Sequence, residues 1–153
     1  MVGIKRLGIL LLVALLAGIG PMVANGADDV AGLINEGEAK LAAGDIDAGI
    51  AVLRRATEQD PESALAQTRL GGALVLKQDY VQAIETFRVA IAVDAGNAPA
   101  FVGMAIAYLH SGDYALARAA MEEARRIDPA KGADIDKLLA WIEQRESGAP
   151  AAH

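Results

Sequence analysis

The sequence predicts an all-α fold, a right-handed solenoid of three helical hairpins closed by one further helix. The first observation is a repeat, because Asp60, Asp94 and Asp128 lie 34 residues apart. A period of about 20–50 residues is the signature of stacked supersecondary units. The second observation is that apolar residues within each period follow helical spacing and nowhere alternate with polar residues over the length of a strand. Together they favour stacked helices over a sheet.

Many further columns keep the same phase. Most of them hold small residues, which let helix axes approach closely, and one holds bulky residues, which fill the space between layers. We therefore assign residues 27–146 to one repeat domain, with repeats at 30–63, 64–97 and 98–131 and a closing helix at 132–146. The small columns are Ala39, Ala73 and Ala107; Ala56, Ala90 and Ala124; Gly37, Gly71 and Ala105; and Gly49, Ala83 and Ala117; the bulky column is Leu53, Phe87 and Met121.

Each repeat resolves into two helices joined by a short turn. In the second repeat we expect helices over 63–77 and 80–92, because apolar residues follow helical spacing in both. A glycine in the turn accepts the left-handed backbone that ends a helix, and the aspartate after it can cap the next helix. Proline after Asp60 and Asp128 ends the second helix, because proline disfavours helix in the residue before it. The three turns are Gly44–Asp45, Gln78–Asp79 and Gly112–Asp113.

Three in-phase sets of residues carry a resemblance to a known family. They are Leu33, Gly37, Gly44, Asp45, Leu53, Ala56, Asp60 and Pro61 in the first repeat; Leu70, Gly71, Tyr80, Ala83, Phe87, Ala90 and Asp94 in the second; and Phe101, Ala105, Tyr108, Gly112, Tyr114, Ala117, Ala124, Asp128 and Pro129 in the third. Over residues 30–129 this pattern resembles the tetratricopeptide repeat family. Glu36 and Lys40 depart from it, which suits a first helix that no preceding repeat covers.

The last predicted helix, residues 132–146, has one apolar face. Ile135, Leu138, Leu139 and Ile142 are spaced i, i+3, i+4, i+7, and such a face can cover the last repeat as a cap. Trp141 borders this stripe, and it either completes the cap or lies exposed as an interface anchor. We expect residues 147–153 to form a short flexible tail, because they are small and include a proline.

The N-terminus has the order of a secretory signal. Lys5 and Arg6 precede an uncharged apolar run over residues 7–19, and small residues end at Gly26. The apolar run is shorter than the roughly 20 residues that a membrane-spanning helix needs. We therefore predict a signal peptide over residues 1–26 and a periplasmic protein. An uncleaved N-terminal anchor, with the rest facing the periplasm, is the alternative.

Composition excludes several classes of function. The chain of 153 residues has a net charge of −6, which opposes binding to nucleic acid. It contains no cysteine and two histidines, His110 and His153, so a cysteine–histidine metal site is not available. Its serines are expected at helix boundaries, and none lies in a Gly-x-Ser-x-Gly motif. We predict no enzymatic activity, no small-molecule substrate, no metal and no cofactor.

The candidate site is the groove that a repeat array presents on the first helix of each pair. The tetratricopeptide resemblance implies four rows of residues there. Members of the family that clamp a carboxylate do so with lysine and asparagine, which these rows lack. They are mostly apolar, so we expect an apolar peptide or an amphipathic helix as ligand. The rows are Ile34, Thr68 and Val102; Glu38, Gly72 and Ile106; Leu41, Val75 and Leu109; and Ala42, Leu76 and His110.

Each groove residue also has a purely structural interpretation. Leu41, Val75 and Leu109 can pack against neighbouring helices, whereas Thr68 and Gly72 add little packing and favour a functional role. His110 ends a helix, where a cation is favourable electrostatically, although histidine also changes charge near neutral pH and can act as a sensor.

The expected function is a non-catalytic scaffold, adaptor or chaperone-like assembly factor. Its partner would be another exported or membrane protein. The alternatives are a self-associating homo-oligomer and a membrane-tethered assembly factor, with the membrane involved only if the N-terminal segment is retained.

Overall fold

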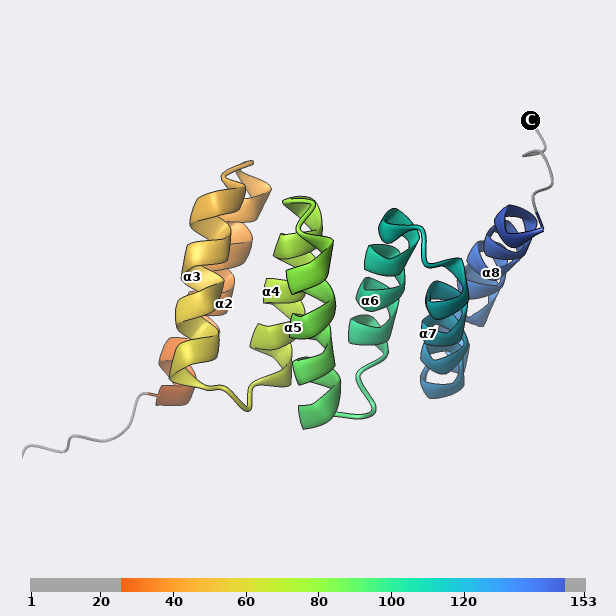
Figure 1. Cartoon of the computed structure of the whole chain (residues 1–153). Helices are drawn as coiled ribbons and strands as arrows, with labels where there is room; N and C mark the ends of the chain where they lie inside the picture. The colour runs from red at the N-terminus through yellow and green to blue at the C-terminus, as the bar shows by residue number, and fades with distance from the viewer. Residues whose placement is uncertain (1–25, 148–153) are drawn as a thin grey trace, which may run out of the picture.

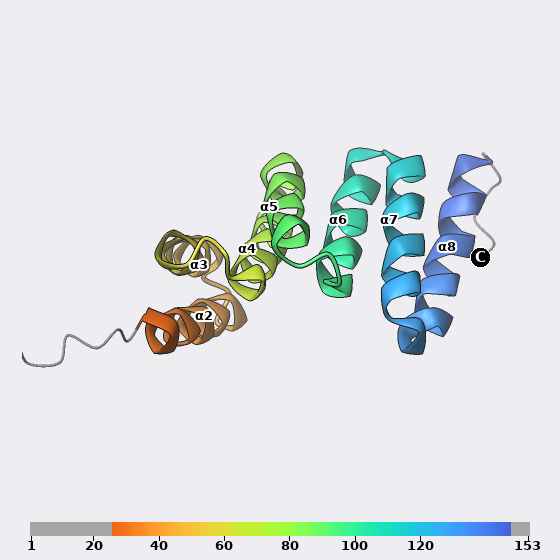
Figure 2. The same ribbon diagram turned by 90° about the horizontal axis from the view of Figure 1, so that it is seen from below.

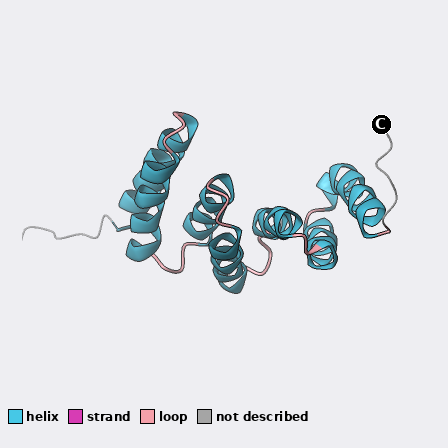
Figure 3. Cartoon of the chain, turned by 45° about the horizontal axis from the view of Figure 1, so that its top comes forward, coloured by secondary structure: helices cyan, strands magenta, loops and turns pink. Residues whose placement is uncertain are grey.

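The computed structural model describes residues 26–147, which form seven α-helices, one 3-10 turn and no strand (Figures 1 and 3). The predicted signal peptide and the predicted tail lie outside the described residues, except for Gly26 and Ser147. The closing helix has the predicted bounds. The elements are α2 (Gly26–Ala42), α3 (Ile46–Gln59), α4 (Ala64–Leu76), α5 (Tyr80–Val93), α6 (Ala98–Ser111), α7 (Tyr114–Ile127), η1 (Pro129–Lys131) and α8 (Gly132–Glu146).

The helices pack as three consecutive hairpins, α2–α3, α4–α5 and α6–α7, and α8 packs on α7 (Figure 1). Each hairpin joins the next through α3 against α4 and α5 against α6. The first helices also contact one another, α2 with α4 and α4 with α6, whereas no such contact joins α3, α5 and α7 in the described region. The first helices therefore form the tighter, inner layer of a curved array. The predicted solenoid is confirmed.

The turns within the hairpins adopt the left-handed backbone that the sequence predicts. Gly44 and Gly112 have φ of 84° and 82°, and Gln78 takes the equivalent place with φ of 66°. The carboxylates of Asp45 and Asp79 then accept hydrogen bonds of 3.2 Å from backbone N–H groups three residues ahead. The third aspartate, Asp113, makes no side-chain capping hydrogen bond. The capping prediction therefore holds for two of the three hairpins.

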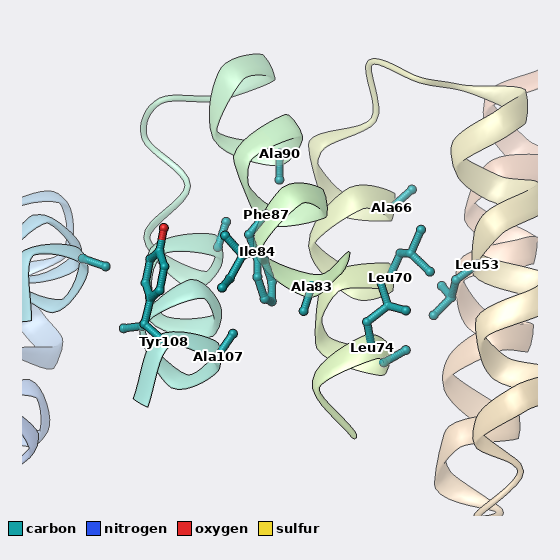
Figure 4. Close-up of a cluster of buried hydrophobic side chains, with 14 of the residues drawn as sticks. Leu53, Ala66, Leu70, Leu74, Ala83, Ile84, Phe87, Ala90, Ala107 and Tyr108 are labelled. Atoms are coloured by element: carbon teal, nitrogen blue, oxygen red, sulfur yellow. The ribbon is translucent and has the colours of Figure 1, made fainter. Parts of the chain in front are cut away.

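Phe87 shows why small residues recur in the core (Figure 4). Its ring is 1% exposed and occupies the space beside Gly71 of α4 and Gly103 of α6. A Cβ atom at Gly71 would lie 2.6 Å from Phe87 Cε1, which is closer than carbon atoms can approach. Gly37 stands in the same relation to Leu53 one repeat earlier. Close approach of helix axes therefore requires these glycines.

A second row of small residues faces the preceding repeat. Ala73 and Ala107 are 1% and 0% exposed, whereas Ala39, their equivalent in the first repeat, is exposed. The difference follows from position, because no described helix precedes α2. Glu36 and Lys40 are exposed on the same face of α2, as their polarity predicts.

Candidate functional site

An exposed stripe runs along α4 on the inner layer. Leu65, Arg69, Gly72 and Leu76 are spaced i, i+4, i+7, i+11, so they lie on one face of the helix. Leu65 and Leu76 are 51% and 57% exposed. Leu65 was not among the predicted groove residues. Its place seven residues before Gly72 is the signal that would have found it.

Gly72 forms a notch between these two leucines. A Cβ atom built on it would meet no atom within 4 Å, in contrast to its neighbour Gly71. A glycine inside a helix is less favourable than alanine by about 1 kcal/mol. The packing of the described residues gives no reason for a glycine at position 72. A ligand whose backbone lies close to α4 would give one.

We call the groove-facing side chains of α4 and α6 together the inner wall. The part of this wall that α6 supplies contains no carboxylate, lysine or arginine. Val102, Ile106 and Leu109 are half-buried, and each also packs against the hydrophobic core. The sequence of α6, from Ala98 to Ser111, contains no aspartate, glutamate, lysine or arginine. This wall therefore offers apolar contacts and no lysine or arginine that could hold a carboxylate.

The residues of one predicted row face the first helix of the following hairpin, and they face the groove only in part. This row consists of Ile34, Thr68 and Val102. Ile34 and Thr68 are 5% and 8% exposed. The hydroxyl of Thr68 donates to the Ala64 carbonyl at 2.7 Å and accepts from Asn97 Nδ2 at 2.9 Å, which ties α4 to the start of α6. The structure therefore gives Thr68 a packing role. Of this row, Val102 alone remains half-buried.

Two side-chain pairs mark the ends of the wall. Glu38 of α2 pairs with Arg69 of α4, and both side chains are nearly half-exposed. At the other end, the ring of His110 stacks on Tyr80, with centroids 4.8 Å apart and planes inclined by 1°. The stack orients the imidazole, an interaction that the sequence did not reveal. The remaining predicted residues, Leu41, Val75 and Leu76 with the neighbouring Ala42, are half-buried or exposed.

A separate crevice of about 290 Å³ opens between α6 and α8, with α7 as its floor. Most of its wall is apolar, and charged residues lie only towards α8. Val102 is the one predicted groove residue that lines it. The lining residues are Ala98, Pro99 and Val102 of α6; Met121, Ala124 and Asp128 at and beyond α7; and Lys131, Asp134, Ile135 and Leu138 towards α8.

The closing helix covers α7 with part of its apolar face. Ile135, Leu139 and Ile142 are buried, whereas Leu138 is 38% exposed because it borders the crevice. Trp141 is 39% exposed, and the Arg145 guanidinium lies 4.8 Å from its ring centroid. Trp141 therefore stands at the edge of the cap with much of its ring accessible.

Other chemistry is sparse in the described part of the chain. No group of three or more histidine, aspartate or glutamate side chains is arranged to hold a metal ion between residues 26 and 147. None of the helices in this range has the length and apolarity to cross a bilayer. Arg88 of α5 donates a 3.2 Å hydrogen bond to the Tyr108 hydroxyl, which raises the pKa of the guanidinium.

Comparison with known proteins agrees with this architecture. Two family models, both described as tetratricopeptide repeat, match residues 34–100 and 74–142. The two matches overlap and extend over most of the repeat array. The chain belongs to the tetratricopeptide repeat family. No curated protein sequence matches it.

Solved structures with the same fold include domains that hold peptides. The first such domain of Spaghetti (RPAP3), bound to the HSP90 peptide SRMEEVD, superposes with a TM-score of 0.76 at 17% identity, covering 84% of this chain and 99% of that one. The TPR2B domain of yeast Sti1, in a pHsp70 complex, gives 0.74 at 21% identity, with 78% and 99% covered. The Yersinia enterocolitica type III secretion translocator chaperone SycD gives 0.74 at 16% identity, with 78% and 96% covered. These identities establish the shared fold.

Proposed function

We propose that the protein is a non-catalytic interaction module whose inner wall binds an apolar segment of another protein. The observation that carries the proposal is the stripe on α4, where two half-exposed leucines flank the notch at Gly72. Such a stripe fits a peptide or an amphipathic helix that inserts alternate apolar side chains. The neighbouring helix α6, which contains no carboxylate, lysine or arginine, extends the same apolar wall.

The chemistry of this wall differs from that of an acidic-peptide site. The RPAP3 domain holds the peptide SRMEEVD, which has three carboxylate side chains in its last four residues. Here the wall presents Arg69, already paired with Glu38, and neither a second arginine nor a lysine on α4 or α6. Residues 26–147 carry 12 basic and 20 acidic side chains, a net charge of −8. The ligand class that we infer is therefore apolar and not acidic.

We further propose that the module acts in the periplasm. The support is the N-terminal sequence, in which Lys5 and Arg6 precede an apolar run and small residues end at Gly26. N-terminal sequencing of the exported protein tests this part separately. A start at Ala27 is expected, and recovery of the chain with residues 1–26 still attached would favour the anchored alternative.

A double substitution on the stripe tests the binding wall. Leu65→Glu with Leu76→Glu places two carboxylates where the ligand would bury apolar groups, so capture of partners from a periplasmic extract should fall at least about tenfold. Both leucines are exposed, so the circular dichroism spectrum should remain helical. Val75 and Leu109 are less suitable, because they also pack against the core.

The matched control is Val81→Glu on α5. Val81 is 74% exposed on the outer layer, so it tests the effect of a new surface carboxylate away from the wall. Val81→Glu should capture the same proteins as the unmodified chain. Equal capture by the double variant would refute the assignment of the inner wall.

A further inference from the structure

The crevice between α6 and α8 exists because the repeat rule stops at α8. Residues 34 apart along the array place Ala73, Ala107 and Trp141 in one column. In α4 and α6 the column is alanine, fully buried against the preceding repeat. In α8 it is tryptophan, which is too large for the same close approach.

The rest of that face follows the same pattern. Ala66 and Ala100 are 0% exposed in α4 and α6, and their equivalent in α8 is Asp134, an exposed carboxylate. In line with this difference, α4 contacts α6 directly, whereas α8 contacts α7 and η1 and has no close backbone contact with α6 (Figure 2). Val102, which a closer helix would cover, stays half-buried and lines the crevice.

We propose that this crevice receives one bulky apolar side chain of a partner protein, next to a lysine or arginine of the same segment. The proposal rests on the proposed function and names the chemistry of its ligand. An apolar cavity of about 150 Å³ is large enough for benzene, so about 290 Å³ accommodates a phenylalanine or tryptophan side chain.

The charges at the mouth favour a basic neighbour. Asp128 is partly buried there, and the Lys131 ammonium is 4.0 Å away, too far for a hydrogen bond. The carboxylate of Asp128 can therefore still accept a hydrogen bond from a cation on the ligand. Asp134, on the same rim, adds a second carboxylate, which Lys137 pairs at 3.2 Å. The net charge of −8 over residues 26–147 opposes a second copy of the chain as occupant.

Trp141 supplies a built-in reporter. It is the only tryptophan in the chain, and it lies one turn along α8 from Leu138, which lines the crevice. We choose three blocked nine-residue peptides as probes, each with a central phenylalanine and no tryptophan. The phenylalanine is flanked by lysine and serine in the first, by serine alone in the second, and by glutamate and serine in the third.

The expected result is a saturable change in Trp141 emission with the lysine and serine probes and no change with the glutamate probe. The lysine probe should bind with the highest affinity. Leu138→Glu should weaken the lysine probe at least about tenfold, because the phenylalanine would bury an unpaired carboxylate. Asp128→Asn should leave the serine probe unchanged and remove the preference for lysine. Asp128 makes no side-chain capping hydrogen bond, so this variant should fold normally. Val81→Glu should respond to each of the three probes as the unmodified chain does.

Several outcomes would overturn the inference. No saturable change with any probe would do so, as would probe binding that Leu138→Glu leaves intact. Emission that depends on protein concentration without a probe would identify a second copy as the occupant. If Leu65→Glu with Leu76→Glu abolished probe binding and Leu138→Glu did not, the crevice assignment would fail while the inner wall remained supported. Methyl NMR gives the same decision for a folded variant, because shifts should appear at Val102 and Leu138 and not at Val75.

Discussion

The two sides of α6 differ although the helices repeat in the same phase. On one side α6 lies directly against α4, with Ala107 fully buried, and Thr68 hydrogen-bonds Asn97 across the seam. On the other side α8 stands away from α6 and leaves a crevice. Ala107, which is buried in the seam between α4 and α6, has Trp141 as its counterpart in the seam between α6 and α8. The residue in this column thus differs between the packed seam and the open one.

The comparison also explains where a repeat protein can place a binding site. Thr68 and Val102 occupy equivalent positions, yet Thr68 is buried by the next repeat and Val102 is not. Inside the array each repeat covers its neighbour, so the seams contain core. Where the pattern changes, at the last seam, apolar surface that the pattern would bury stays accessible.

Truncating the large residue at each seam should show the difference most strongly. Phe87→Ala should cost about 3–5 kcal/mol in the free energy of unfolding, because it leaves an enclosed cavity beside Gly71 and Gly103. Met121, the equivalent residue at the next seam, is fully buried and yet lines the crevice. Met121→Ala should lie near the lower end of its usual range of about 2–5 kcal/mol, since the open seam can relax. Urea unfolding followed by circular dichroism measures both free energies. Equal losses would mean that the seam between α6 and α8 is as tightly packed as the seam between α4 and α6.

Moving the bulky residue into the closed seam should have the next largest effect. Ala107→Trp puts tryptophan where the seam between α4 and α6 leaves no space, and overpacking of this kind costs about 1–3 kcal/mol, occasionally more. Ala39→Trp makes the same change at the equivalent exposed position of α2, where the cost should stay within about 0.5 kcal/mol. Thermal unfolding of the pair isolates the effect of the seam. A similar loss in both variants would show that the column does not control how closely the helices approach.

The sequence was sufficient to predict the fold because each signal that is weak alone recurs at the same position in all three repeats. The column of Ala73 and Ala107, the turns at Gly44 and Gly112, and the bounds of α8 all follow from periodicity and local backbone preferences. Asp113 is an exception, because its carboxylate makes no capping hydrogen bond although its sequence context matches the other two turns.

The site was less predictable, because accessibility depends on the neighbouring helix and not on the residue itself. Thr68 looked functional as a polar residue that adds little packing, and α6 covers it through Asn97. Leu65 follows the helical apolar spacing of its repeat, yet it is half-exposed. The crevice could not be found from groove rows alone, since it depends on how far α8 stands from α6. The sequence feature that could have indicated the crevice is the change from Ala107 to Trp141 at equivalent positions of the repeat.

Apart from the control Ala39→Trp, the smallest expected effect on stability belongs to Trp141→Ala, which tests the comparison between the two seams most directly. The substitution removes the contact with Arg145, worth about 0.5–1 kcal/mol at an exposed site, and restores the alanine found at the other seam. Without the large ring, α8 should settle against α6 and bury Val102. Nuclear Overhauser contacts between the methyl groups of Val102 and Leu138 should then strengthen, while affinity for a phenylalanine probe, measured by calorimetry, should fall. If the crevice stayed open, the spacing of α8 would have to be set by Asp134 and by the path of the chain through η1, and the column at 141 would lose its explanatory role.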